Sequence, residues 1–280
     1  MKMGYKSTMA ATAIASLFLL TLVQFGLNVG HGQDEKPLPV LLIHGWNNDA
    51  SVWKGWIDEL NNTGIYAEAV TFGEGDPEYD ACGSSADHAA DLDQIVEDFK
   101  SRTHAEKINL VAHSKGGLDA RVFLANNLAN EDVANLIMIG TPNRGSPVAD
   151  HFVGQGIIVC APAVYDLLSD SDATKADVNT NTKYHTIASD WTSEYVFPFL
   201  PYDANCPALL SWFAYNEWGT IAFQKWVRDQ VIEGPDDGMV PLRSADPSDQ
   251  ILNSLGHTNN CHTNLFTQEE LDKALSVLIP

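Results

Sequence analysis

Short apolar runs alternate along the chain with stretches of helical periodicity. Runs of strand length, rich in Val, Ile and Leu, occupy residues 39–43, 65–72, 107–112 and 135–139, with a fifth candidate at 184–188. Between several of these runs, apolar residues recur every three or four positions, which places them on one face of a helix. Strands that alternate with helices are typical of parallel βαβ units. The pattern therefore predicts an α/β fold with a mostly parallel central sheet and helices on both of its faces.

The clearest helical pattern covers about residues 85–102. Its apolar residues follow one another at intervals of 3, 4 and 3, and they are Ala89, Leu92, Val96 and Phe99. These positions share one face of a helix, whereas the opposite face is rich in Asp and Glu. We expect the acidic face to contact solvent. Further helices are predicted from Ser51 onward and over 118–128.

The alternation breaks down between about residues 149 and 230, where Tyr, Trp, Pro, Asp and Asn accumulate. This stretch predicts an insertion over the sheet rather than a second domain. Its apolar residues form either a lid over a groove or a packed extension of the core, and both interpretations stay open. They are Val153, Ile157, Ile158, Phe197, Phe199, Leu209, Leu210, Trp212 and Phe213.

The first residues resemble a secretory signal. Lys2 and Lys6 precede an apolar run without charged side chains over about residues 9–30, and small residues follow at Gly30 and Gly32. We expect residues 1–32 to be a signal peptide and residues 33–280 to be the folded α/β domain. The run is also long enough to span a membrane as an uncleaved anchor. In either case the domain is expected outside the cytosol.

Composition narrows the function further. The chain has 280 residues, of which 16 are Lys or Arg and 37 are Asp or Glu, so its formal net charge is −21. Such a surface repels phosphates and excludes a basic nucleic-acid binder. The cysteines lack the C-x-x-C spacing of a zinc or redox motif; in an oxidising compartment they favour disulfides, whose pairing stays open. They are Cys82, Cys160, Cys206 and Cys261.

One predicted strand runs directly into a candidate nucleophile. Residues 112–116 read Ala-His-Ser-Lys-Gly, which matches the G-x-S-x-G elbow with Ala in place of the first Gly. The elbow needs small residues on both sides of the serine because the sharp turn brings backbone and helix close together. A strand before and a helix after the motif supply the context that it requires. We therefore expect Ser114 to be a catalytic nucleophile.

A serine hydroxyl needs a base within hydrogen-bond reach, and the base needs a carboxylate to orient it. After an elbow of this kind the acid comes first along the chain and the histidine later. We predict Asp237, beside a turn-forming glycine, as the acid, with Asp236 as the alternative. We predict His262 as the base because it precedes a helix-capping signal at 267–270, with His257 as the alternative.

When a serine attacks a carbonyl carbon, the carbonyl oxygen becomes an oxyanion. Two backbone N–H donors are needed to stabilise it. The first is expected from Lys115, the residue after the nucleophile. The second is expected from the loop after the first strand, at Trp46, where Gly45 allows a close approach.

Four motifs together carry a resemblance to a known family. They are residues 39–46 (PVLLIHGW), 109–121 (NLVAHSKGGLDAR), 139–146 (IGTPNRGS) and 236–245 (DDGMVPLRSA). In this order they resemble the secreted triacylglycerol lipase and esterase branch of the α/β-hydrolases. The resemblance extends from residue 39 to the end of the chain, apart from the middle insertion. The chain departs from the family at Lys115, where Met or Gln is usual, and in the insertion, so substrate preference does not carry over.

The resemblance implies an α/β-hydrolase fold and a hydrolase that cleaves carboxylic esters through an acyl-enzyme, with Ser114, His262 and Asp237 as its triad. No cofactor or catalytic metal is expected; a structural calcium ion occurs in some relatives, but no motif locates one here. The expected partner is an ester or lipid substrate, with transient contact at a lipid interface and no nucleic acid; oligomeric state stays open. An acyltransferase or amidase with the same triad and a non-catalytic binding module are the alternatives.

Overall fold

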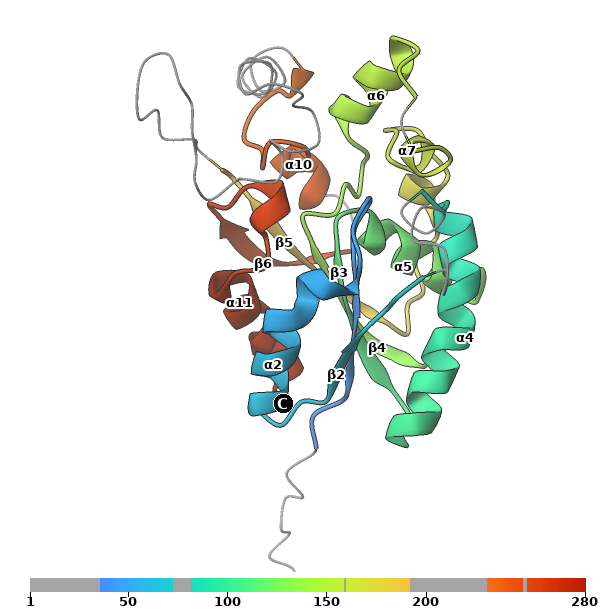
Figure 1. Cartoon of the computed structure of the whole chain (residues 1–280), viewed down its shortest axis with the longest axis vertical. Helices are drawn as coiled ribbons and strands as arrows, with labels where there is room; N and C mark the ends of the chain where they lie inside the picture. The colour runs from blue at the N-terminus through green and yellow to red at the C-terminus, as the bar shows by residue number, and fades with distance from the viewer. Residues whose placement is uncertain (1–35, 73–81, 159, 192–230, 249–250) are drawn as a thin grey trace, which may run out of the picture. The chain divides into compact units, whose positions relative to one another are not determined.

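The computed structural model describes residues 36–72, 82–158, 160–191, 231–248 and 251–280. A six-stranded sheet with the order β2-β1-β3-β4-β5-β6 forms its centre, and every neighbouring pair of strands is parallel (Figure 1). The strands are β1 (Val40–Ile43), β2 (Ala67–Ala69), β3 (Ile108–His113), β4 (Val133–Ile139), β5 (Lys183–Ser189) and β6 (Asn253–Thr258). The predicted α/β class with a mostly parallel sheet is confirmed.

Helices connect the strands. They are α2 (Lys54–Asn62), α4 (Ser85–Thr103), α5 (Lys115–Asn126), α6 (Pro147–Gly154), α7 (Ala163–Asp166), α10 (Leu242–Ala245) and α11 (Gln268–Leu278). Short 3-10 turns cover Ala50–Trp53, Ala173–Lys175 and His262–Asn264. The helices predicted at 85–102 and 118–128 correspond to α4 and α5, and α5 begins directly after Ser114.

Alternate residues of the central strands belong to two hydrophobic cores, one on each face of the sheet. In β1, Leu41 and Ile43 pack with α4 and α5, whereas Val40 and Leu42 pack with α2 and α11. Successive side chains of a strand point to opposite faces, so a strand buried on both faces reads as a continuous apolar run. Figure 1 shows α4 and α5 on one side of the sheet and α2 and α11 on the other.

The edges of the sheet differ from the prediction. β2 is only three residues long, within the longer run predicted at 65–72, and β6 was not predicted as a strand. β6 reads Asn-Ser-Leu-Gly-His-Thr, and most of its residues are partly or fully exposed. An edge strand with polar residues and a glycine lacks the apolar signal by which strands are recognised.

The predicted insertion lies only partly within the described residues. α6 and α7 belong to this region, and Ile157 and Ile158 after α6 are exposed to 47% and 43%. Residues 192–230, which hold the apolar positions from Phe197 to Phe213, lie outside the described residues, as does the signal predicted at 1–32. Among the helices that the structure describes, none is long and apolar enough to cross a membrane.

A disulfide joins Cys82, just before α4, to Cys160, shortly before α7. Cys261, beside the predicted base, is also disulfide-bonded. Cys206 lies outside the described residues. The sequence-based expectation of disulfide bonding is thus confirmed at Cys82, Cys160 and Cys261.

Candidate active site

Ser114 stands at the turn between β3 and α5. Its backbone adopts φ 53° and ψ −129°, a positive-φ conformation that non-glycine residues rarely adopt. The amide of Ser114 donates to the carbonyl of Ile139 at the end of β4, at 2.9 Å. β1 and β3 are neighbours although β2 lies between them in the chain, so the loops after β1 and β3 leave the sheet at its topological switch point. In open α/β sheets this position is where ligands bind.

Glycines allow the turn to approach its neighbours. A Cβ atom on Gly116 would lie 2.2 Å from the carbonyl oxygen of His44, and one on Gly117 would lie 2.0 Å from Thr141 Oγ1. Both distances are far below van der Waals contact. The small residues of the elbow are therefore required by the loops that follow β1 and β4.

Gly116→Ala is expected to destabilise the fold by about 3 kcal/mol, because the obstructing atom is backbone and the helix must shift. Gly55→Ala is the matched control, since a Cβ there meets nothing within 4 Å. In a helix interior this change is expected to stabilise by about 0.5–1 kcal/mol. Urea unfolding of both variants measures the difference. Equal unfolding midpoints would contradict the close packing of the elbow.

His262 lies between the nucleophile and a carboxylate. Its Nε2 is 2.8 Å from Ser114 Oγ, and its Nδ1 is 2.7 Å from Asp237 Oδ2. A carboxylate accepts hydrogen bonds, so Nδ1 carries the proton and Nε2 is left to accept from the serine hydroxyl. The ring thus has the orientation expected of the predicted base.

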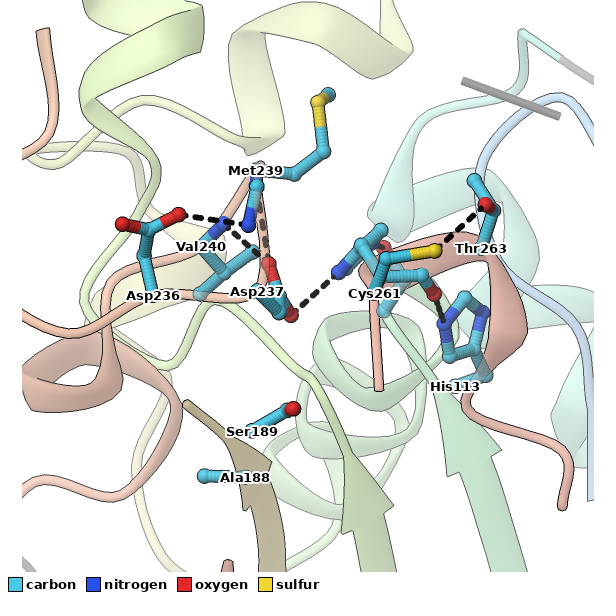
Figure 2. A network of polar contacts seen from close by, with 12 residues as sticks. His113, Ala188, Ser189, Asp236, Asp237, Met239, Val240, Cys261 and Thr263 are labelled. Atoms are coloured by element: carbon cyan, nitrogen blue, oxygen red, sulfur yellow. Dashed lines mark hydrogen bonds and ion pairs between the residues drawn. The ribbon is translucent and has the colours of Figure 1, made fainter. Parts of the chain in front are cut away.

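Asp237 is completely buried. Its Oδ1 accepts from the amides of Met239 and Val240 at 3.0 and 2.8 Å, which leaves Oδ2 for the imidazole. The backbone carbonyl of Asp237 also accepts from the amide of His262 at 2.8 Å. Figure 2 shows Asp237 between the turn with Met239 and the segment with Cys261. Both the carboxylate and the backbone of Asp237 therefore position the histidine.

The two alternative residues lie elsewhere. The Asp236 carboxylate accepts from the amide of Gly238 at 2.7 Å and points away from Asp237 (Figure 2). His257, on β6, places its Nε2 3.2 Å from Asp246 Oδ2, and 45% of its side chain is exposed. The structure thus brings together Ser114, His262 and Asp237, and leaves Asp236 and His257 outside this set of contacts.

His113, the residue before the nucleophile, supports the segment that carries the base. Its Nε2 donates to the carbonyl of His262 at 2.9 Å (Figure 2). The centroids of the two rings lie 5.0 Å apart. Burial lowers the pKa of His113 well below its usual value, and the nearby His262 lowers it further. His113 is therefore neutral, with its proton on Nε2.

Buried neutral histidines make the fold sensitive to acid. Burial lowers the pKa of His113 and of His44, whereas the unfolded chain takes up these protons near pH 6.5. Below that pH the unfolded state binds more protons than the native state, so we expect the unfolding free energy to fall as the pH drops. Each group contributes at most about 1.4 kcal/mol per pH unit.

Urea midpoints at several pH values from neutral to mildly acidic measure this slope. His113→Gln should reduce it, whereas His104→Asn, at an exposed position of positive φ that Asn tolerates, should leave it unchanged. A stability that holds constant or rises on acidification would contradict the expectation.

The two predicted oxyanion donors belong to segments that adjoin Ser114. Lys115 is the first residue of α5, where backbone N–H groups have no acceptor in a preceding turn. Trp46 follows Gly45, and a Cβ on Gly45 would lie 2.9 Å from Ser114 Cβ, so this loop touches the nucleophile. The Trp46 side chain packs against a cluster that includes Leu118 and Leu167. Both backbone segments are close enough to the elbow to supply donors.

Sequence reasoning missed the side chain of Lys115. It considered only the backbone amide, but the side chain is buried and pairs with Asp119 at 2.6 Å. The available signal was the spacing of a Lys and an Asp four residues apart, which places them on one face once the helix begins at Lys115 rather than at the predicted residue 118.

Among the described residues, no group of three or more His, Cys, Asp or Glu side chains is arranged to hold an ion. The structural calcium left open by the sequence therefore has no located site in this part of the chain.

The parallel sheet, the serine elbow and the neighbouring histidine and aspartate define an α/β-hydrolase. Residues 39–199 match the family model described as palmitoyl protein thioesterase, which is more than half of the chain. The chain belongs to this family.

Curated relatives include two triacylglycerol lipases. Triacylglycerol lipase 2 of Saccharomyces cerevisiae is 29% identical over 165 residues, which cover 56% of this chain and 45% of that protein. Triacylglycerol lipase of Pseudarthrobacter phenanthrenivorans is 32% identical over 120 residues, covering 40% of this chain and 35% of that protein. The matches thus span less than half the length of either relative.

Solved structures share the fold. A lipase of Bacillus licheniformis in its mature form superposes with a TM-score of 0.66 at 19% identity, covering 88% of this chain and 93% of that chain. A metagenomic carboxyl esterase gives a TM-score of 0.55 at 17% identity, covering 86% of this chain and 75% of that chain. At these identities the likeness establishes the α/β-hydrolase fold.

Proposed function

We propose that the protein is a serine hydrolase that cleaves carboxylic esters through an acyl-enzyme intermediate. One observation carries the proposal: the His262 ring bridges Ser114 Oγ, at 2.8 Å, and Asp237 Oδ2, at 2.7 Å. This is the arrangement that activates a serine hydroxyl. The palmitoyl protein thioesterase family and the relatives named triacylglycerol lipase support acyl-group hydrolysis.

In the first half of the reaction, Ser114 Oγ attacks the carbonyl carbon while His262 Nε2 takes its proton. The carbonyl oxygen becomes an oxyanion, which the amides of Lys115 and Trp46 stabilise. Asp237 holds the ring and stabilises its positive charge. His262 then gives the proton to the leaving alcohol, and the acyl group stays on Ser114.

In the second half, water attacks the acyl carbon and His262 takes a proton from it. The oxyanion forms again between the same two amides. When it collapses, the bond to Ser114 Oγ breaks, and His262 returns the proton to the serine. The products are a carboxylic acid and the free enzyme, so no cofactor is required.

Thioesters are a second candidate substrate class, favoured by the family match over residues 39–199. The same triad serves both classes, because only the leaving group differs.

The proposal places the activity outside the cytosol, and the disulfide between Cys82 and Cys160 supports this location. Transient contact with a lipid interface belongs to the proposal, since the relatives are named lipases.

An active-site label tests the proposal most directly. We expect an alkyl fluorophosphonate to modify one residue per chain, and peptide mass spectrometry to locate it at Ser114. A matched series of p-nitrophenyl esters and acyl thioesters, from two to sixteen carbons, then ranks the substrate classes. An unmodified Ser114 together with no turnover in either series would reject the hydrolase and favour a binding module.

A further inference from the structure

The side chain of Lys115 is enclosed beneath the elbow. The residue exposes 1% of its surface, and its ammonium lies 2.6 Å from Asp119 Oδ1 and 3.7 Å from Asp166 Oδ2. A buried ammonium is costly unless it is paired. Burial raises the pKa of Asp166. Asp119, which is closer to the ammonium, is its principal counter-charge. The residue whose amide is the proposed oxyanion donor therefore carries a buried ion pair.

Asp119 connects this ion pair to the start of α4. Its Oδ1 also accepts from Ser85 Oγ at 2.6 Å, and its Oδ2 is 2.8 Å from His88 Nδ1. Burial acts to raise the pKa of Asp119, but Lys115 and His88 outweigh burial, so the pKa lies below its usual value. Asp119 is thus a carboxylate that joins the first turn of α5 to the first turn of α4.

The same contacts continue to the loop that carries the other donor. The His88 ring stacks on Phe72 with centroids 4.0 Å apart, and Phe72 meets the edge of His44 at 5.4 Å. His44 Nδ1 in turn lies 2.9 Å from the carbonyl of Gly45, which precedes Trp46. A continuous buried chain of contacts therefore runs from Lys115 to the loop of Trp46.

We propose that Lys115 is a positioning residue, whose buried ion pair with Asp119 fixes the two oxyanion-donating amides relative to each other through His88 and Phe72. This inference rests on the proposed hydrolase function. Oxyanion donors act at about 2.7–3.1 Å from the developing charge, so a shift of a few tenths of an ångström in either amide weakens their effect. Stability alone gives a weak reason for the pair, because apolar residues of similar volume often replace buried ion pairs without loss.

Two variants test the proposal. Lys115→Met keeps the length of the side chain and removes its charge. Lys115→Met with Asp119→Asn also removes the counter-charge while keeping an amide for Ser85 and His88. The matched control is Lys54→Met, which breaks a Lys–Asp pair of the same spacing, at 2.8 Å, on the exposed surface of α2. Ser114→Ala is assayed alongside.

We expect kcat to fall about 10- to 100-fold in both Lys115 variants, less than the 10²- to 10³-fold loss typical when a whole donor is removed. KM should stay near the parent value. A trifluoromethyl ketone, which forms a tetrahedral oxyanion on the serine, should bind more weakly by the same factor as the loss of kcat. Lys54→Met should match the parent.

Each other outcome is decisive. A folded double variant with parental kcat and ketone affinity would overturn the proposal. Failure of both variants to fold would also overturn it, because the pair would then serve stability alone. If Ser114→Ala keeps the turnover of the parent, the hydrolase function itself fails. If Ser114→Ala is inactive and the double variant is unaffected, only the role of Lys115 fails.

Discussion

Ser114→Ala is expected to lower kcat for ester hydrolysis by about 10⁵- to 10⁶-fold. Among the contacts that the described residues make with the His262 ring, Ser114 Oγ, 2.8 Å from Nε2, is the only hydroxyl. Without it the acyl-enzyme cannot form. The residual rate would come from the oxyanion donors and substrate binding alone.

Steady-state turnover of a p-nitrophenyl ester measures the effect, and the variant should also fail to react with the fluorophosphonate. Serine and alanine both carry a Cβ, so the positive φ at position 114 costs about the same in the variant as in the parent. The unfolding midpoint should therefore stay close to that of the parent. Equal turnover by variant and parent would refute the role of Ser114 as nucleophile.

His262→Ala is expected to lower kcat by roughly 10³-fold or more, because Ser114 then loses the base that takes its proton. The same substitution at His257 should leave turnover unchanged. His257 is part-exposed, and it pairs with Asp246 rather than with the serine. Loss of that exposed pair should cost at most about 1 kcal/mol of stability.

Parallel kinetics of the two alanine variants decide between the histidines. A selective loss at His257 would reverse the assignment of the base. Equally large losses of kcat in both variants, with unchanged unfolding midpoints, would mean that the contact between the His262 ring and Asp237 does not identify the base. Reaction with the fluorophosphonate should be slowed by His262→Ala alone.

The elbow around Ser114 could be predicted because its signal is local. The elbow is five consecutive residues, and the strand before it and the helix after it are apolar patterns that survive in the structure as β3 and α5. The capping signal at 267–270 likewise corresponds to a capping box at the start of α11, between Thr267 and Glu270. Features that depend on neighbouring residues were therefore accessible from the sequence.

The alternatives at the acid and the base could not be separated in this way. Asp236 and Asp237 are adjacent, and only the turn decides which carboxylate meets the ring: the amides of Met239 and Val240 hold Asp237, whereas Gly238 holds Asp236. β6 was missed because an exposed edge strand needs no apolar alternation. The contact of Lys115 with Asp119 is local, whereas its approach to Asp166 of α7 joins segments that are distant in the sequence.

The hydrogen bond between Ser114 and His262 joins residues 148 positions apart. During synthesis the elbow is therefore made well before the imidazole is added. The segment after His262 forms α11, whose Leu271, Ala274 and Leu278 pack in the core on one face of the sheet. Under the proposed function, a nascent chain that has not yet reached His262 lacks the base and carries an unactivated serine.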